Sequence, residues 1–206
     1  MYIPKQYNKE DYQEIKAFMQ SYNFATIIST RDGRPLATHV PVNIMEDGET
    51  LYITGHVAKR NQQWRTLDSS EHILVIFQGP HSYISSTWYE DEDVPTWNYQ
   101  SVQVYGNSRL LTEDELITDL TALLDKYEGH REHGAIWDNM SEKTKSQMKG
   151  IVGFQIKVAE IFAAYKLSQS RSEADKDNII DTLLTSKNHL DHEVAEAMSQ
   201  ERKSTN

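Results

Sequence analysis

The chain has 206 residues, a net charge of −10 and no cysteine, which excludes disulfide bonds, thiol catalysis and cysteine-ligated metal sites. Its basic residues form no cluster, and an acidic chain without one repels the phosphates of nucleic acids. It contains no apolar run long enough to span a membrane and no signal-peptide core after Met1, so we expect a cytoplasmic protein without membrane contact.

The first third of the chain predicts one helix followed by a series of hairpins. Tyr12, Ile15 and Phe18 recur at helical spacing after Asn8, a possible N-cap. The Asp32-Gly33 pair is typical of a tight turn between two strands. The expected elements are a helix over 9–21, strands over 24–30, 36–42 and 51–55, turns at 31–34 and 46–49, and a short helix that carries Trp64 and Leu67.

The segment 74–106 is unusually aromatic. A buried strand over 73–77 leads into a turn and a loop, and 99–111 predicts the next strand. Aromatic side chains at this density suit a site that stacks a flat ligand or an interface that buries a partner. The alternative is that they cover the ends of a small barrel. Because only 38% of the residues are hydrophobic, we expect a second copy of the chain to cover part of the apolar surface.

The second half adds helices and one long strand. Thr112 and Glu115 form a capping box for a helix that runs to about Glu128, and 130–149 is polar and partly helical. The strand over 151–167 changes the phase of its alternation at Ala159-Glu160, which predicts a bulge or a sharp bend. We expect an α+β fold on an antiparallel barrel over 1–167, and a helical appendage over 168–206 with helical patterns at 179–184 and 194–198.

Two places in the first strands and turns are candidate ligand sites. The turn from His56 to Asn61 lies where a strand ends and a helix begins, and it carries Lys59 and Arg60, so it suits a phosphate group. The alternative is an ordinary turn with exposed bases. His39 shares a strand face with small residues, on which a planar ring could lie, although a structural histidine is the favoured explanation of this position.

Other polar motifs are less informative. Asn98 and Gln169 could pair with the edge of a heteroaromatic ring, but each also suits a loop. The pairs His130/His133 and His189/His192 have the spacing of metal ligands without a third ligand, so we expect solvated surface and no metal site. The acidic run 90–93 is typical of a solvated loop, and we find no catalytic motif.

Several long blocks together resemble the PaiB-type FMN-binding negative transcriptional regulators, within the FMN-binding split-barrel superfamily of the pyridoxamine phosphate oxidases. The blocks are MYIP at the start, ATHVPV (37–42), GHVAKRNQQWR (55–65), FQGPHSYISSTWY (77–89), VPTWNYQSVQVYG (94–106), IVGFQIKV (151–158) and KLSQSR (166–171). The chain departs from the family pattern at Gln62 and Ser86, where the family usually has proline, at Ser170, where asparagine is common, and in the acidic run 90–93.

The resemblance implies a split β-barrel with Greek-key-like antiparallel strands, a homodimer, and FMN bound at the subunit interface. It implies cofactor contacts from Thr38, His39, Val40, Thr54, Gly55, His56, Lys59 and Asn61, and, from or near the other subunit, from Trp97, Asn98, Gln169 and Arg171. DNA is implied as a partner only by the family name. The alternatives are a flavin-dependent oxidoreductase acting on a small molecule and a haem-binding split barrel.

Overall fold

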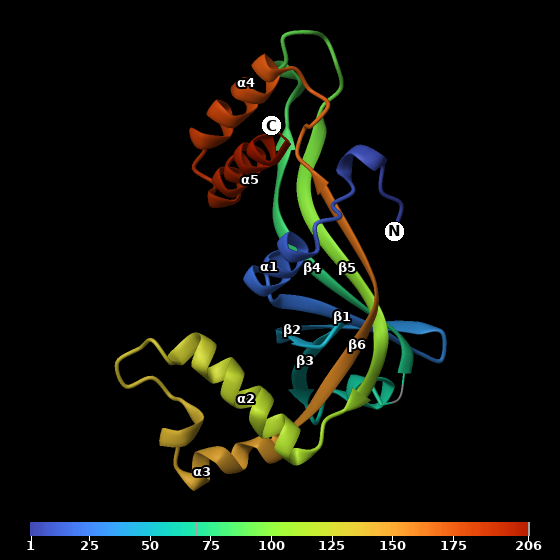
Figure 1. Cartoon of the computed structure of the whole chain (residues 1–206), viewed down its shortest axis with the longest axis vertical. Coiled ribbons are helices and arrows are strands. Elements are labelled where there is room, and N and C mark those ends of the chain that lie inside the picture. Colours follow the sequence, from blue (N-terminus) through green and yellow to red (C-terminus); the bar gives the residue numbers. More distant parts are fainter. Residues whose placement is uncertain (69, 206) are drawn as a thin grey trace. The chain divides into compact units, whose positions relative to one another are not determined.

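The computed structural model describes residues 1–68 and 70–205, over which strands and helices alternate (Figure 1). The strands are β1 (Phe24–Arg31), β2 (Arg34–Asp47), β3 (Thr50–Ala58), β4 (Ser70–Ile84), β5 (Thr96–Leu110) and β6 (Ile151–Lys166). The α-helices are α1 (Tyr12–Ser21), α2 (Glu113–Glu128), α3 (Glu142–Lys145), α4 (Glu173–Leu184) and α5 (His189–Thr205). Short 3₁₀ turns are η1 (Lys5–Tyr7), η2 (Gln62–Thr66), η3 (Ser86–Trp88), η4 (Trp137–Asn139) and η5 (Ser146–Gly150).

The strands form a closed barrel in the order β1-β2-β3-β6-β5-β4. β1, β2 and β3 are consecutive antiparallel neighbours, and β4 returns to pair with β1, which is the Greek-key order. Asp32 and Gly33 both have positive φ angles, of 52° and 77°, as the two-residue hairpin turn between β1 and β2 requires. The predicted antiparallel α+β barrel is confirmed.

The chain divides into two compact units. One, called here the barrel unit, comprises Lys16–Phe77 and Gln103–Ile161. The other, called here the tail unit, comprises Met1–Ile15, Gln78–Val102 and Phe162–Asn206. The strands β4, β5 and β6 therefore contribute residues to both units, and the predicted boundary at 167/168 stays a prediction.

Alternation along the strands separates the inside of the barrel unit from its outer faces. Ile27, Ile53 and Phe154 are fully buried and belong to the apolar core. β5 and β6 approach closely at Gly106, where an added Cβ would lie 2.3 Å from the carbonyl oxygen of Lys157. Glycine is therefore required at this position for steric reasons.

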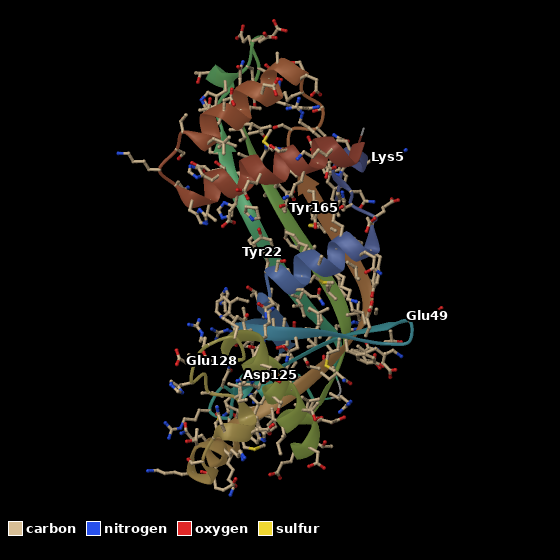
Figure 2. The ribbon with its side chains drawn as sticks, turned by 60° about the vertical axis from the view of Figure 1, so that its left-hand side comes forward. Lys5, Tyr22, Glu49, Asp125, Glu128 and Tyr165 are labelled. Carbon is tan, nitrogen blue, oxygen red and sulfur yellow. The ribbon has the colours of Figure 1, made fainter. Side chains whose placement is uncertain are left out.

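The helix α2 packs on β2 and β3, and its start follows the predicted capping box. The Thr112 hydroxyl accepts a hydrogen bond from the Glu115 amide (3.3 Å), and the Glu115 carboxylate accepts one from the Thr112 amide (2.8 Å). The Arg109 guanidinium also donates two hydrogen bonds to that carboxylate, and with the Thr112 amide it lowers the pKa of Glu115 to about 2. At the far end of the helix, Asp125 and Glu128 lie on its last turns (Figure 2).

Some predicted boundaries are wrong. The helix α1 begins at Tyr12 rather than at residue 9, because the Asp11 carboxylate, and not Asn8, accepts the hydrogen bond from the Glu14 amide (2.8 Å). β4 and β5 each run for 15 residues, so the aromatic loop expected between them is shorter and much of its sequence is strand. In β6 the alternating burial of Phe154 and Ile156 ends at the exposed Ala159 and Glu160, and residues 163–165 are all buried; the predicted bulge or bend stays a prediction.

The tail unit contains the two predicted C-terminal helices. α4 and α5 pack against each other through buried apolar side chains that include Ile179, Leu183, Val194 and Met198. Tyr165, near the end of β6, is among the largest fully buried side chains (Figure 2). Along the described ranges, no helix is both long and apolar enough to cross a membrane.

Candidate functional site

The turn after β3 presents two cations. Lys59 and Arg60 are exposed, and neither forms an ion pair with any residue that the structure describes. The Asn61 side chain caps η2 by accepting a hydrogen bond from the Gln63 amide (3.1 Å), and it donates one to the Thr38 hydroxyl (2.9 Å). The turn is therefore fixed to β2, while its positive charges remain unpaired.

A buried glutamine completes this hydrogen-bond network. Gln63 is only 3% exposed and donates to the carbonyl oxygens of Ile27 and Leu36, at 3.1 Å each. Its amide oxygen accepts a hydrogen bond from the Thr38 hydroxyl. Sequence reasoning missed Gln63, because a polar residue in a short turn usually faces water. Its side chain also donates a hydrogen bond to the Ser29 hydroxyl (3.1 Å). All four of these partners lie on β1 and β2, so Gln63 fixes the turn against both strands.

His39 lies on the outer face of β2 in the barrel unit. Its ring stacks on Phe24 of β1, with centroids 6.1 Å apart and an interplanar angle of 29°. Phe24 is 66% exposed, and His39 and Ala37 are exposed too. Together they form an open face of aromatic and small side chains, as a flat ligand or a second protein surface requires.

Thr54 and His56 point to the same outer face of β3, where α2 covers them. The Asp119 carboxylate of α2 accepts hydrogen bonds from the Thr54 hydroxyl (2.5 Å) and the Asn43 amide (2.7 Å). One nitrogen of His56, Nδ1, is buried without a hydrogen-bond partner among the described residues. Burial lowers the pKa of His56, and Asp119 partly opposes this shift. His56 is therefore a half-buried neighbour of Asp119, and burial disfavours its charged form.

Two other predicted residues line the interior of the barrel. Val40 is 6% exposed, and Gly55 is buried with the Phe154 ring about 3.0 Å from where its Cβ would be. Their side-chain positions face the core, so a contact from either residue to a ligand would have to come from the backbone.

In the tail unit, two of the predicted residues already use their amides within the chain. Asn98 is fully buried, and its amide exchanges hydrogen bonds with the Ser168 hydroxyl (2.9 and 3.2 Å). The Gln169 amide accepts a hydrogen bond from the Leu167 N–H (2.8 Å) and donates one to the Tyr165 carbonyl (2.5 Å). These bonds hold the chain where β6 ends and Ser168 adopts a φ of 61°.

Trp97 and Arg171 are more accessible. Trp97 is 48% exposed and donates its indole N–H to Nδ1 of His81 (3.2 Å). The Arg171 guanidinium stacks on the Tyr89 ring at 3.8 Å and forms an ion pair with Asp93 at 2.6 Å. The pKa of Asp93 is lowered, mainly by the hydrogen bond from the Val94 amide and secondly by Arg171. The acidic loop, expected to be solvated, thus supplies a partner for Arg171.

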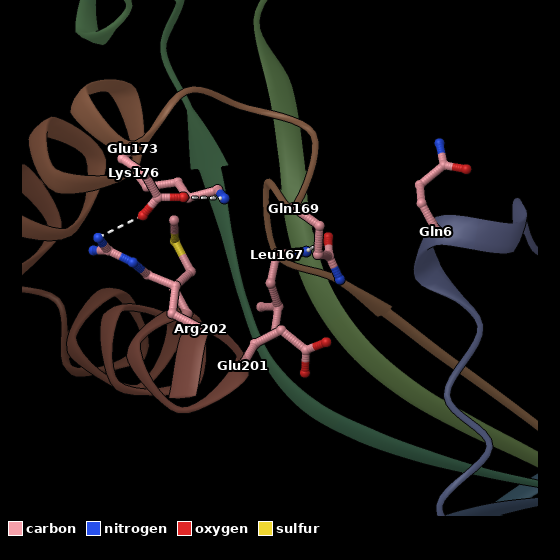
Figure 3. A pocket seen from close by; sticks show the side chains of 8 residues that line it. Gln6, Leu167, Gln169, Glu173, Lys176, Glu201 and Arg202 are labelled. Atoms are coloured by element: carbon pink, nitrogen blue, oxygen red, sulfur yellow. Dashed lines mark hydrogen bonds and ion pairs between the residues drawn. The ribbon is translucent and has the colours of Figure 1, made fainter. Parts of the chain in front are cut away.

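A cavity of about 230 Å³ lies beside Gln169 in the tail unit (Figure 3). Its charged side chains neutralise one another, because Glu173 pairs with Lys176 (2.8 Å) and with Arg202 (2.6 Å). Its lining consists of Gln6, Leu167, Gln169, Glu173, Lys176, Met198, Glu201 and Arg202. With its cations already paired, this cavity gives no indication of a ligand class.

The barrel has the fold of the FMN-binding split barrels. The chain is similar to the FAD and haem binding protein from Mycobacterium smegmatis, with a TM-score of 0.60 and 16% identity over 82% of this chain and 78% of that one. It is also similar to the flavocytochrome Anf3 from Azotobacter vinelandii, with a TM-score of 0.58 and 14% identity over 80% and 72% of the two chains. At these identities the likeness establishes the fold alone.

Sequence comparison identifies the family within this class. The family model described as "Putative FMN-binding domain" matches residues 1–160, and the chain belongs to that family. It is 48% identical to the "Protease synthase and sporulation protein PAI 2" of Bacillus subtilis over 204 residues, which is 98% of this chain and 99% of that protein. The resemblance to PaiB-type regulators is confirmed, and the individual cofactor contacts stay predictions.

Proposed function

We propose that the chain binds FMN, with the phosphate held at the turn of Lys59 and Arg60. The observation that carries this proposal is the unpaired charge of these two exposed cations in a chain of net charge −10. Nearby, the network of Thr38, Asn61 and Gln63 fixes the turn before any ligand arrives. Fixed donors lose little conformational entropy on binding, so the turn suits a phosphate dianion.

The chemistry of the neighbouring residues fits the rest of the cofactor. The open face of Phe24, Ala37 and His39 offers a flat, partly aromatic surface on which an isoalloxazine ring could lie. When bound, a flavin supplies electron and hydride exchange. The role of the chain's own residues is to bind and orient it: Lys59 and Arg60 through charge and His39 through ring contact, while Thr38 and Asn61 hold the turn in place through their hydrogen bonds within the chain.

A homodimer is part of the proposal. In the tail unit, Tyr83 and Trp97 are each 48% exposed and pack edge to face with centroids 6.0 Å apart. In the barrel unit, Phe24 is still more exposed. Exposed aromatic clusters are typical of protein interfaces, and a stable homodimer often buries more than about 2,000 Å² in total. In this dimer Trp97 and Arg171 would reach the cofactor of the other subunit.

The regulatory role is proposed from family membership, together with a cytoplasmic location. Direct DNA contact would require a local basic face on an acidic chain. We expect no sequence-independent DNA binding at physiological salt. A gel-shift titration of random duplex DNA at about 150 mM salt checks this, since each neutralised phosphate steepens the salt dependence. A clear micromolar shift would contradict the expectation.

Titration with FMN tests the proposed function. Purified chain at micromolar concentration is titrated with FMN, and the visible spectrum and the quenching of flavin fluorescence are followed. We expect saturation at one FMN per chain. Light scattering on the same sample should give twice the 23.8 kDa of a single chain. The absence of saturable FMN binding would contradict the cofactor assignment, and a monomer would contradict the proposed assembly.

A further inference from the structure

An apolar groove opens beside the end of β3 in the barrel unit. It has a volume of about 400 Å³ and lies between the start of α2, the turn η5 and the first residues of β6. Its floor is formed by Leu111 and Leu116, which pack directly over Gly153: an added Cβ there would lie 2.9 Å from Leu116 and 3.0 Å from Leu111. Half-buried Met148 forms part of its wall. The volume and the apolar lining are those of a small-molecule site.

The charges at the rim of this groove are unbalanced. Lys59 and Lys149 both line it, both are exposed, and neither pairs with an acidic group in the described part of the chain. Glu113 is the single acidic residue in the lining. This contrasts with the cavity beside Gln169, where each lysine and arginine of the lining has an acidic partner.

We propose that this groove binds a small amphipathic anion, of the class of medium-chain fatty acids. The apolar floor would take the hydrocarbon chain, because burial of each methylene contributes about 0.8 kcal/mol. The carboxylate would lie at the rim between Lys59 and Lys149. An unpaired cation beside an apolar surface favours a ligand that joins a hydrocarbon chain to a carboxylate. An uncharged or cationic amphiphile would leave the two lysines unpaired.

Calorimetric titration of the full-length chain with decanoate, below its critical micelle concentration, tests the proposal. We expect saturable binding at one site per chain, and at least ~3-fold weaker binding of decanol, which lacks the charge. Lys149→Ala should weaken decanoate binding by ~3- to 10-fold, and Met148→Glu, which places a carboxylate in the groove, should abolish it. Glu113→Gln should strengthen binding, since it removes the acidic charge from the rim.

Lys143→Ala is the matched control, because Lys143 is an exposed lysine nearby that does not line the groove. It should leave decanoate binding unchanged. Circular dichroism and the melting temperature show whether each variant is folded, and the surface variants Lys149→Ala and Glu113→Gln keep the proposal testable if Met148→Glu does not fold. No saturable binding, or equal binding of decanol and decanoate, would overturn the proposal.

Competition with FMN separates this groove from the proposed cofactor site, since Lys59 is named in both. We expect decanoate still to bind in the presence of saturating FMN. If FMN weakens decanoate binding, the remaining binding should still be reduced by Lys149→Ala. If FMN abolishes decanoate binding and Lys149→Ala has no effect, Lys59 serves the cofactor alone and the groove proposal is wrong. Failure of decanoate binding with intact FMN binding would likewise leave the proposed function standing.

Discussion

The exposed cations and ring of the barrel unit and the amides of the tail unit, all predicted to contact the cofactor, differ in how much of their bonding capacity the chain itself already uses. In the barrel unit, Lys59 is exposed and has no ion-pair partner among the described residues, and His39 is open on one face of β2. In the tail unit, Asn98 and Gln169 have their amides hydrogen-bonded inside the chain, and Arg171 is paired with Asp93. Both sets come from equally clear family blocks.

This difference indicates that membership of a family motif does not by itself define a ligand contact. A side chain whose donors are already paired must break those bonds before it can bind a ligand, whereas an unpaired exposed cation gains a partner directly. We therefore infer that the barrel unit supplies most of the FMN affinity. Asn98 and Gln169 act mainly to hold the chain where β6 ends.

Removing an unpaired cation should have the largest effect on binding. Lys59→Ala is expected to weaken FMN by about ten- to a hundredfold, because a charge-assisted hydrogen bond contributes roughly 1.5–3 kcal/mol. Fluorescence titration with FMN measures this. Lys157→Ala, an exposed lysine on β6 of the same unit, is the control and should bind FMN like the wild type. Equal losses in the two variants would indicate a general charge effect instead of a specific contact.

Removing a paired amide should change stability more than binding. Asn98→Ala leaves the Ser168 hydroxyl without its buried partner, which costs about 1–3 kcal/mol of unfolding free energy. Urea denaturation measures the loss of stability. The folded variant should bind FMN within about threefold of the wild type, and a threefold change in affinity is less than half, in free energy, of a tenfold change. The contrast between the units would fail if Asn98→Ala kept its stability and lost FMN affinity.

The smallest expected effect is the pH dependence of stability that comes from Glu115 at the start of α2, in the barrel unit. The pKa of Glu115 is lowered from 4.5 to about 2, by the Arg109 guanidinium first and the Thr112 amide second. A lowered folded-state pKa stabilises the protein above pH 4.5, and this contribution is lost as the pH falls from 4.5 towards 2. Glu115 is partly exposed, so solvent screening limits the contribution to less than about 1 kcal/mol.

Denaturation of Glu115→Gln and wild type at a series of pH values tests this point. The variant should be less stable at pH 7, and the difference should shrink as the wild-type carboxylate is protonated. A difference that stays constant down to pH 3 would show that the electrostatic pairing contributes nothing and that only the shape of the side chain matters.

Local chemistry explains which parts of the fold could be predicted from the sequence. The turn at Asp32-Gly33 and the capping box of Thr112 each depend on neighbours within a few residues, and each is confirmed. The start of α1 was predicted wrongly because two capping residues, Asn8 and Asp11, compete over a short distance. The lengths of β4 and β5 depend on pairing with strands far away in the sequence, which no local pattern records.

In the candidate site, too, features that depend on sequence neighbours could be predicted, and features that depend on distant residues could not. The sequence singled out the cations of the turn, since an exposed base next to a helix start is visible locally. It could not indicate that Asn98 meets Ser168, 70 residues away, or that Gln63 meets Leu36, because those contacts exist only after folding. The bonding state of each predicted residue therefore had to come from the structure.

The central claim is that charge at the turn of Lys59 and Arg60 holds the phosphate of FMN. The most direct test compares FMN with riboflavin, which has the same ring system and lacks the phosphate. Calorimetric titration of the wild-type chain with each flavin should give at least about tenfold tighter binding of FMN, and the advantage should shrink in Lys59→Ala. Equal affinity of the wild type for FMN and riboflavin would contradict the claim.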